Sequence, residues 1–296
     1  MDGILNIYKE KGYTSHDVVA KLRGILHQKK IGHTGTLDPD ATGVLPVCVG
    51  RATKLCDMLT DHSKTYRAVM LLGVMTDTQD LSGTVLTRAQ ESDMVHITKD
   101  AVCAAIMSYV GTYQQIPPMY SALKVNGKKL YELARAGIEV ERKARTVEIE
   151  EIRILDVNLP EVTIEVSCSK GTYIRTLCHD IGQKLGVGAA MKELTRTKVD
   201  RFLLEDALTL SQVESLRDAG ALEQHMISLE TMFDALPKLT VDASLDKLLL
   251  NGNKFKRTDE YTENTQVRVY DSQGHFTGIY CKQQSEYRPV KMFLGS

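Results

Sequence analysis

The sequence predicts a mixed fold of helices and strands in two units. Segments with apolar residues at helical spacing alternate along the chain with segments of strand-like apolar pattern. Of the 296 residues, 43% are hydrophobic and 25% are charged, which is typical of a globular protein and excludes a fibrous or wholly disordered one. The composition changes near Pro237, so we expect one unit over 1–236 and a smaller one over 237–296.

The first third of the chain contains two predicted strands, a helix and a loop. Residues 3–9 form a short apolar run, which predicts a strand. Ser15 predicts the N-cap of a helix whose apolar positions continue to Leu26. Residues 31–43 combine glycines with Pro39 and have no helical period, which predicts a loop. Residues 64–73 predict a strand that is covered on both faces, because both sides are largely apolar.

The rest of the chain alternates helices with hairpins. Asn158-Leu159-Pro160 separates two β-like runs and predicts a hairpin, and Ser272-Gln273-Gly274 predicts a second one. Thr98 predicts the cap of a helix that reaches Tyr109. The hairpin strands are expected at 146–157 with 161–168 and at 266–270 with 276–280, and further helices at 128–136, 175–185, 211–219 and 244–250.

The charges and cysteines narrow the class of protein. Lysines and arginines gather at 21–30 and 124–145, whereas acids gather at 203–236. For one basic run an ordinary solvated helix face is the simpler interpretation, but two such runs favour a polyanionic partner. The six cysteines form no Cys-x-x-Cys pair, so we expect reduced thiols and no metal site. Because the N-terminus lacks a secretory pattern and no apolar run approaches roughly 20 residues, we expect a cytoplasmic protein without a membrane span.

The densest set of reactive residues is the loop Gly32-His33-Thr34-Gly35-Thr36-Leu37-Asp38-Pro39-Asp40-Ala41-Thr42-Gly43. Glycines allow close backbone approach, and Pro39 biases Asp38 away from the helical region. The pattern therefore presents a carboxylate on a loop, although a simple Asx-turn explains many Asp-Pro pairs. The pattern does not choose between Asp38 and Asp40. It also lacks the Gly-Lys-Ser/Thr ending of a nucleotide-binding P-loop.

Two other segments offer side chains for a site. In Lys170-Gly171-Thr172-Tyr173-Ile174-Arg175-Thr176-Leu177, Tyr173 and Arg175 would share one side of an extended stretch. The Arg175 fork is suited to bidentate pairing with a carboxylate such as Asp38. Tyr66 lies between two basic residues at the start of a predicted strand. On spacing alone, a core tyrosine and a surface arginine are the favoured interpretation of the first segment, and a half-buried strand tyrosine is the simpler interpretation of the second.

The loop over 32–43 resembles the signature of the bacterial TruB-type tRNA pseudouridine-55 synthases. The resemblance continues in the family's order over almost the whole chain, through Thr14-Ser15, Ala52-Thr53-Lys54, Lys64-Thr65-Tyr66, Pro117-Pro118-Met119-Tyr120-Ser121-Ala122-Leu123-Lys124 and the 170–177 segment. The tail, with Val267-Arg268-Val269-Tyr270, Gly278-Ile279-Tyr280 and Pro289-Val290-Lys291, is similar to the family's PUA-like RNA-binding domain. Two positions depart from the family: Glu10 replaces a common proline and Asp200 replaces a common glycine.

The resemblance implies a fold, an activity and a set of site residues. The fold would be α+β, with a mixed, mostly antiparallel sheet, flanking helices, a central cleft and a β-rich, PUA-like C-terminal domain. The activity would be isomerisation of uridine to pseudouridine at position 55 in the T-arm of tRNA, by base flipping and without cofactor or metal. Asp38 would be the catalytic carboxylate, and the expected substrate contacts are His33, Lys54, Tyr66, Tyr173, Arg175 and Leu194. We expect a monomer that binds the T-arm stem-loop.

Two alternatives follow from the same residues. The chain could be a non-catalytic RNA-binding or RNA-folding protein on this scaffold, against which the intact Asp38, Tyr66 and Arg175 weigh. It could also be a hydrolase that uses Asp38 and Asp40 as an acid and base pair. The hydrolase predicts that both carboxylates matter equally, whereas the isomerase needs only one of them.

Overall fold

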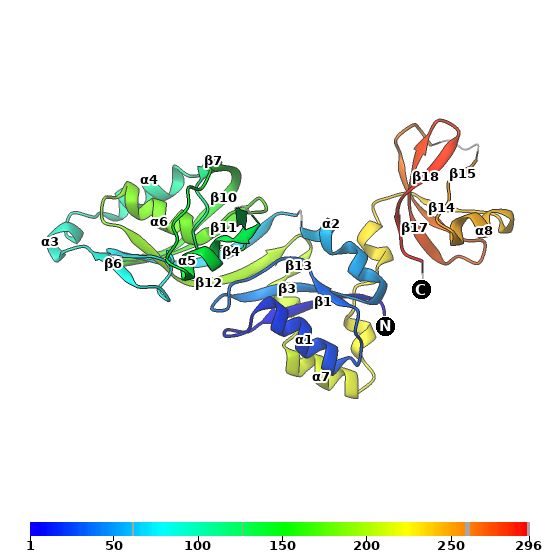
Figure 1. Cartoon of the computed structure of the whole chain (residues 1–296), viewed down its shortest axis with the longest axis horizontal. Helices are drawn as coiled ribbons and strands as arrows, with labels where there is room; N and C mark the ends of the chain where they lie inside the picture. Colours follow the sequence, from blue (N-terminus) through cyan, green and yellow to red (C-terminus); the bar gives the residue numbers. More distant parts are fainter. Residues whose placement is uncertain (61, 126, 258–260, 295–296) are drawn as a thin grey trace.

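The computed structural model describes residues 1–60, 62–125, 127–257 and 261–294. Figure 1 shows a larger body that contains both the N-terminal strands and most helices, and a small β-rich body at the C-terminal end. Residue 126 of the second predicted basic segment, and 258–260 and 295–296 of the predicted C-terminal unit, lie outside the described residues.

The larger body is built on a mixed sheet. Its strands are β1 (Gly3–Lys9), β2 (Ile31–His33), β3 (Thr42–Val49), β4 (Lys64–Leu72), β7 (Gly111–Gln115), β10 (Arg145–Asn158), β11 (Glu161–Cys168), β12 (Ala189–Val199) and β13 (Phe202–Leu203). The main path runs β1-β3-β12-β4-β11-β10-β7, with β2 beside β3 and β13 beside β12. Neighbouring strands are antiparallel except β3 and β12, which pair in parallel through only two residue pairs. This short parallel contact joins the two halves of the sheet.

Two pairs of helices cover the two halves. α1 (Ser15–Ile25) and α7 (Leu210–Asp218) pack with β1 and β3 around Leu5, Leu22 and Leu45. α4 (Lys99–Met107) and α6 (Ile174–Lys184) pack with β4, β10 and β11 around Ile106 and Ile164. The two apolar clusters therefore fix each half of the sheet separately, and β3 and β12 meet between the two halves.

Short elements complete the larger body. They comprise the helices α2 (Cys56–Thr60), α3 (Glu91–Met94) and α5 (Leu130–Arg135), the hairpins β5 (Val74–Thr76) with β6 (Val85–Arg88) and β8 (Lys124–Val125) with β9 (Lys128–Lys129), and 3-10 turns at Gly50–Leu55, Leu204–Asp206, Leu222–His225 and Glu230–Phe233. In the described part of the chain, no helix is long and apolar enough to cross a membrane.

The C-terminal body is a second sheet with one helix. Its elements are β14 (Lys238–Thr240), α8 (Ala243–Leu250), β15 (Phe255–Lys256), β16 (Gln266–Tyr270), β17 (Phe276–Gln283) and β18 (Glu286–Met292). The strand order is β14-β16-β17-β18-β15. Phe276 and Phe293 pack on Phe233 of the larger body, with ring centroids 6.2 and 5.6 Å away. An aromatic contact thus holds the second sheet against the first body.

The structure corrects several sequence expectations. Thr14, not Ser15, caps α1, because its hydroxyl accepts from the Asp17 amide while Asp17 accepts in return. The Ser15 hydroxyl instead accepts from the Leu37 amide at 2.9 Å. The predicted loop over 31–43 is shorter, since its ends belong to β2 and β3. The strand β4 buries only one face fully, and Arg67 on the other face is exposed.

Two further corrections concern element starts. The predicted helix over 128–136 begins at Leu130, because Lys128 and Lys129 pair with β8 in a small hairpin. Arg175 lies in the first turn of α6 and not in an extended stretch with Tyr173. The departure at Asp200 is accommodated in the turn between β12 and β13, where its φ is +50°, a conformation in which glycine is common.

Candidate active site

The candidate site lies where β3 and β12 meet. Gly43 has a φ of +106°, and a Cβ on it would lie 2.2 Å from the Arg196 carbonyl oxygen. The hydroxyls of Thr42 and Thr195 are 2.9 Å apart across the same contact. Only glycine lets the two strands approach this closely, so the glycine that ends the reactive loop fixes its place against β12.

Asp38 and Arg175 form an ion pair that bridges the two halves of the sheet. Asp38 comes from the loop between β2 and β3, and Arg175 comes from α6. The Arg175 Nε lies 3.1 Å from Asp38 Oδ2. The side chain of Arg175 is 7% exposed, whereas that of Asp38 is 44% exposed. The carboxylate is therefore accessible from solvent, whereas the arginine that pairs with it is buried. A carboxylate that acts on a bound substrate needs such access.

The Arg175 fork does not pair bidentately with Asp38, contrary to the expectation from its chemistry. Its Nη1 donates to the Thr78 carbonyl at 3.1 Å, and its Nη2 donates to the Tyr120 carbonyl at 2.9 Å. Nη1 also lies 3.3 Å from Asp80 Oδ2. Only the Nε edge remains for Asp38. The guanidinium is thus fixed by several partners before it meets the carboxylate.

Asp80 is a part of the site that the sequence reasoning missed. It is itself held by a turn, because its Oδ1 accepts from the Thr78 hydroxyl at 2.7 Å and from the Ser82 amide at 3.0 Å. Arg175 therefore lies between two carboxylates, the half-exposed Asp38 and the more buried Asp80. Aspartate in a threonine- and serine-rich turn is common, so no local signal pointed to it.

Opposing effects act on the Asp38 carboxyl. Burial is the largest and raises its pKa, Arg175 lowers it, and Asp80 raises it again. The net result is a pKa above the ordinary aspartate value. Arg175 thus limits, but does not reverse, the cost of placing this carboxylate in the cleft.

Lys9 is a second residue that the sequence reasoning missed. It is fully buried. Its Nζ donates to the carbonyls of Ala41 at 2.6 Å, Pro39 at 3.1 Å and Glu10 at 3.2 Å. Burial lowers the pKa of Lys9 to about 8, although Asp38 and Asp40 oppose that shift. Its ammonium therefore holds the reactive loop through backbone carbonyls. In the sequence, Lys9 is only a lysine at the end of a predicted strand, and nothing there indicates this role.

Tyr66 and Tyr173 both lie near Asp38. Tyr66 is 9% exposed in β4. Burial raises its pKa, and Arg196 opposes the shift. Tyr173 precedes α6, and its amide donates to Gln115 Oε1 at 2.7 Å. The charge of Asp38 acts on both phenols, which places both rings near the carboxylate.

The remaining predicted contacts are more dispersed. His33 packs edge-on against His16 with ring centroids 5.1 Å apart, and burial lowers its pKa. Leu194 is half-buried in β12 beside β4 and packs against the core. Lys54 donates from Nζ to the Met292 carbonyl of the C-terminal sheet at 3.0 Å. The structure thus gathers Asp38, Tyr66, Tyr173 and Arg175, and gives Lys54 a contact with the second body.

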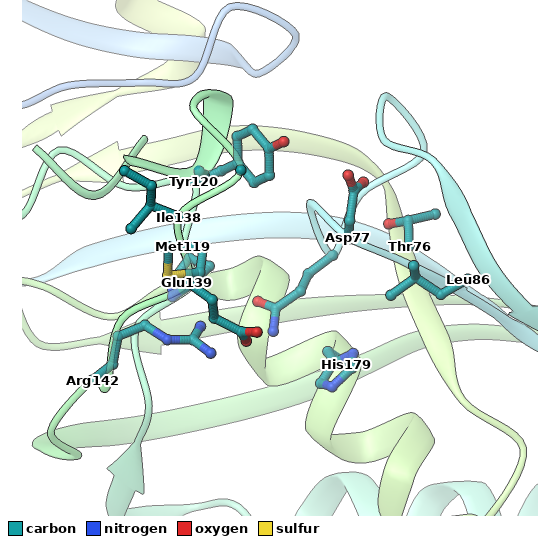
Figure 2. Close-up of a pocket in the computed structure, with 13 residues that line it drawn as sticks. Thr76, Asp77, Leu86, Met119, Tyr120, Ile138, Glu139, Arg142 and His179 are labelled. Atoms are coloured by element: carbon teal, nitrogen blue, oxygen red, sulfur yellow. The ribbon is translucent and has the colours of Figure 1, made fainter. Parts of the chain in front are cut away.

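A cavity of about 340 Å³ lies beside this cluster. Figure 2 shows Asp77, Tyr120, Glu139, Arg142 and His179 around it. Two of its walls are the segments that end at Gln79 and Tyr120, whose neighbouring carbonyls hold Arg175. The cavity therefore shares the segments around Gln79 and Tyr120 with the frame that holds Arg175. Among the described residues, no group of three or more His, Cys, Asp or Glu side chains is arranged to hold a metal ion.

Comparisons with known proteins point to one family. Residues 23–174 match the model of the TruB family pseudouridylate synthase N-terminal domain, and residues 175–250 match that of the tRNA pseudouridylate synthase B C-terminal domain. The chain is 52% identical to the tRNA pseudouridine synthase B of Lachnoclostridium phytofermentans, covering 99% of this chain and 100% of that one. It is 47% identical to the enzyme of that name from Clostridium perfringens, covering 99% of both chains.

Solved structures agree on the architecture. A chain from a Cbf5-Nop10-Gar1 complex superposes with a TM-score of 0.71 at 26% identity, covering 99% of this chain and 85% of that one. A chain from an H/ACA RNP bound to a substrate RNA containing 2'-deoxyuridine gives the same TM-score at 24% identity. The α+β fold with a mostly antiparallel sheet and a β-rich C-terminal part is confirmed.

Proposed function

This chain belongs to the TruB family of pseudouridylate synthases and isomerises uridine to pseudouridine in tRNA, and we propose that its target is uridine 55 in the T-arm and that Asp38 is its catalytic carboxylate. The observation that carries the proposal is the ion pair between Asp38 and Arg175 at the junction of the two half-sheets.

The reaction needs a carboxylate beside the ribose. The N1–C1′ glycosidic bond breaks, the uracil turns within the site, and C5 bonds to C1′. The proton at C5 is lost and N1 gains one, so no cofactor is required. Asp38 can act as a nucleophile at C1′ or C6, or as a base that removes a ribose proton. In each role it must be ionised, which the neighbouring Arg175 favours.

The target base must leave its stack before it can reach Asp38. Extrusion costs a few kcal/mol and is offset by contacts in the pocket. Tyr66 and Tyr173, both near the carboxylate, would hold the flipped uracil, and the half-buried Leu194 would form an apolar wall. His33, on the loop that carries Asp38, would contact the RNA where the base has left.

The RNA arm would lie along the basic segments at 21–30 and 124–145, with the cavity of Figure 2 beside it. Such surfaces recognise folded RNA through phosphates and shape. Lys54 lies next to the C-terminal sheet, where it would contact RNA held by both bodies. We assign residues 1–236 to catalysis and residues 237–296 to a PUA-like domain that grips another part of the tRNA, in a cytoplasmic monomer.

Neither alternative is favoured. A non-catalytic RNA-binding protein has no need of a buried arginine aimed at a loop carboxylate. A hydrolase would need Asp40 as a partner of Asp38, yet Asp40 is exposed. The curated relatives, at 52% and 47% identity over the whole chain, are synthases.

The test is to incubate the protein with an unmodified tRNA transcript and to map pseudouridine by carbodiimide derivatisation and primer extension. We expect one reactive position, uridine 55, and no strand cleavage or free uracil. A transcript with cytidine at position 55 is the matched control and should remain unmodified. Pseudouridine at another position would contradict the T-arm assignment, and released uracil would indicate a hydrolase.

A further inference from the structure

A positive charge is buried beside the base pocket, and the roles given to Asp38 and Arg175 do not use it. The Arg196 side chain is 1% exposed. Its Nε donates to the Val44 carbonyl at 2.7 Å, and its Nη2 donates to the Gly35 carbonyl at 3.4 Å. Among the described residues, no carboxylate forms an ion pair with Arg196. The carbonyl partners do not neutralise the charge of the guanidinium. The buried cation therefore gives the neighbouring part of the pocket a positive electrostatic potential.

The wall that Arg196 adjoins is the one that carries Tyr66. Arg196 and Tyr66 are direct cross-strand partners in the β4 and β12 pair, and both are buried. The positive charge of Arg196 acts on the phenol and lowers its pKa, against the effect of burial. Burial raises the pKa of Tyr66, so the phenol stays protonated at neutral pH. The hydroxyl therefore keeps a proton that it can donate, on a strand directly beside the buried guanidinium. A positive charge beside a hydroxyl polarises the O–H group and makes it a stronger donor.

The isomerisation develops negative charge on the uracil whichever role Asp38 takes. If the glycosidic bond breaks, with or without removal of a ribose proton, its electron pair stays on N1 and spreads to O2 and O4. If Asp38 adds to C6, the electron pair of the C5–C6 bond moves to O4 as an enolate. A preorganised donor aimed at such charge in a closed site lowers the barrier, typically by a factor of 10²–10³.

We propose that Arg196 is a positioning residue whose buried charge polarises the Tyr66 hydroxyl and, through it, stabilises the negative charge on the detached or enolised uracil. The guanidinium is placed for this task by the carbonyls of Gly35 and Val44, which lie on either side of Asp38 in the chain. One buried side chain of β12 thus holds the catalytic loop and lies beside the phenol of Tyr66.

This inference rests on the proposed function, and a double-mutant cycle separates the two. The single-turnover rate would be measured with saturating T-arm hairpin for wild type, Arg196→Gln, Tyr66→Phe and the double variant. We expect Arg196→Gln to lower the rate about 10²-fold and Arg196→Lys, which keeps the charge, about tenfold. Hairpin affinity should change by less than about threefold. Lys192→Gln, which removes a half-exposed cation from the same strand, should match wild type.

The decisive comparison is made in the Tyr66→Phe background. If Arg196 acts through the phenol, adding Arg196→Gln there should lower the rate by less than about threefold, because coupled residues are not additive. Multiplicative losses, or a loss explained by weaker binding, would overturn the proposal. If Arg196→Gln does not fold by circular dichroism, Arg196→Lys replaces it in both backgrounds under the same criterion. A wild type that makes no pseudouridine would instead contradict the proposed function.

Discussion

Two carboxylates share one arginine at the centre of the site, and this sharing sets what each side chain does. Arg175 uses its two terminal nitrogens on the carbonyls of Thr78 and Tyr120 and near Asp80, which leaves Nε for Asp38. A lysine has the charge but not the fork, so it cannot satisfy these partners together. The role of Arg175 is therefore as much to hold the frame of the cleft as to neutralise the carboxylate.

We expect Arg175→Lys to lower the single-turnover rate ten- to a thousandfold, about 1.4–4 kcal/mol of barrier, with little change in tRNA binding. The charge beside Asp38 survives, but its orientation does not. Rapid-quench assays with carbodiimide detection, together with filter binding, would measure both quantities. A fall in rate that follows wholly from weaker binding would show that Arg175 contacts phosphate instead.

Arg175→Ala should move the pH dependence of the rate. Asp38 acts as the ionised form, and Arg175 is the main effect that lowers its pKa. Without Arg175 the pKa rises further, so the rate should begin to climb at higher pH than in wild type and recover in part as pH increases. The single-turnover rate measured from pH 5 to pH 9 would show the shift. An unmoved rising limb would contradict the pairing.

At the scale of elements, the short parallel contact between β3 and β12 holds the site together. It carries Gly43 against the backbone of Arg196 and sets the end of the loop that presents Asp38. Both Lys9 and Arg196 then hold that loop through its carbonyls. The loop is therefore fixed by backbone contacts on both sides, which leaves its carboxylate free to face substrate.

Gly43→Ala should destabilise the protein by about 2–5 kcal/mol, because it adds left-handed strain and a clash with a backbone carbonyl. Gly12→Ala is the matched control. Gly12 has a φ of +90° but nothing lies within 4 Å of an added Cβ, so strain alone should cost about 1–2 kcal/mol. Urea unfolding would compare the two free energies. Equal destabilisation of the two variants would show that the close backbone approach at Gly43 does not contribute to the free energy of unfolding.

The sequence predicted elements better than long-range interactions. The hairpin of β10 and β11 and the strand β4 follow from local alternation, and they were predicted nearly residue for residue. The start of α6 was predicted within one residue, at 175 against Ile174, but the contact that precedes it was not: Gln115 binds both the amide and the carbonyl of Tyr173. Such a partner, 58 residues away, leaves no local signal.

The same reasoning explains which parts of the site were predictable. Asp38, Tyr66 and Arg175 lie in dense motifs, so the resemblance identified them. Asp80 is 95 residues from Arg175 in sequence, and Lys9 meets the loop across 32 residues. Only the assembled sheet brings them together. Side chains that position others are thus harder to find from sequence than those that face substrate.

At the scale of the whole molecule, the C-terminal sheet is packed against the catalytic body. Phe276 and Phe293 join a shared apolar cluster with Phe233, and Arg51 and Lys54 reach carbonyls near the end of β18. Deleting the C-terminal unit would expose this cluster. Point substitutions on its basic residues are therefore the cleaner way to test whether it grips RNA.

The double substitution Lys256→Gln and Lys291→Gln should weaken binding to full tRNA several-fold. The slope of the logarithm of the affinity against the logarithm of the salt concentration should become shallower by roughly one for every phosphate that is no longer neutralised. Binding and conversion of an isolated T-arm hairpin should stay the same, because the catalytic candidates all precede Pro237. Filter binding over a range of salt concentrations would measure the affinity for each RNA. Equal weakening on the two substrates would argue against a separate RNA-gripping unit.

The most direct test of the account is single-turnover conversion of a T-arm hairpin by Asp38→Asn beside Asp40→Asn. Asparagine keeps the shape of the side chain and removes its charge. We predict that Asp38→Asn lowers the rate at least about 10³-fold, about 4 kcal/mol of barrier, while hairpin affinity stays within a few-fold. Asp40, which is exposed, should tolerate the change almost silently. Comparable rate decreases in both variants, or pseudouridine formation by Asp38→Asn at the wild-type rate, would contradict the assignment of Asp38.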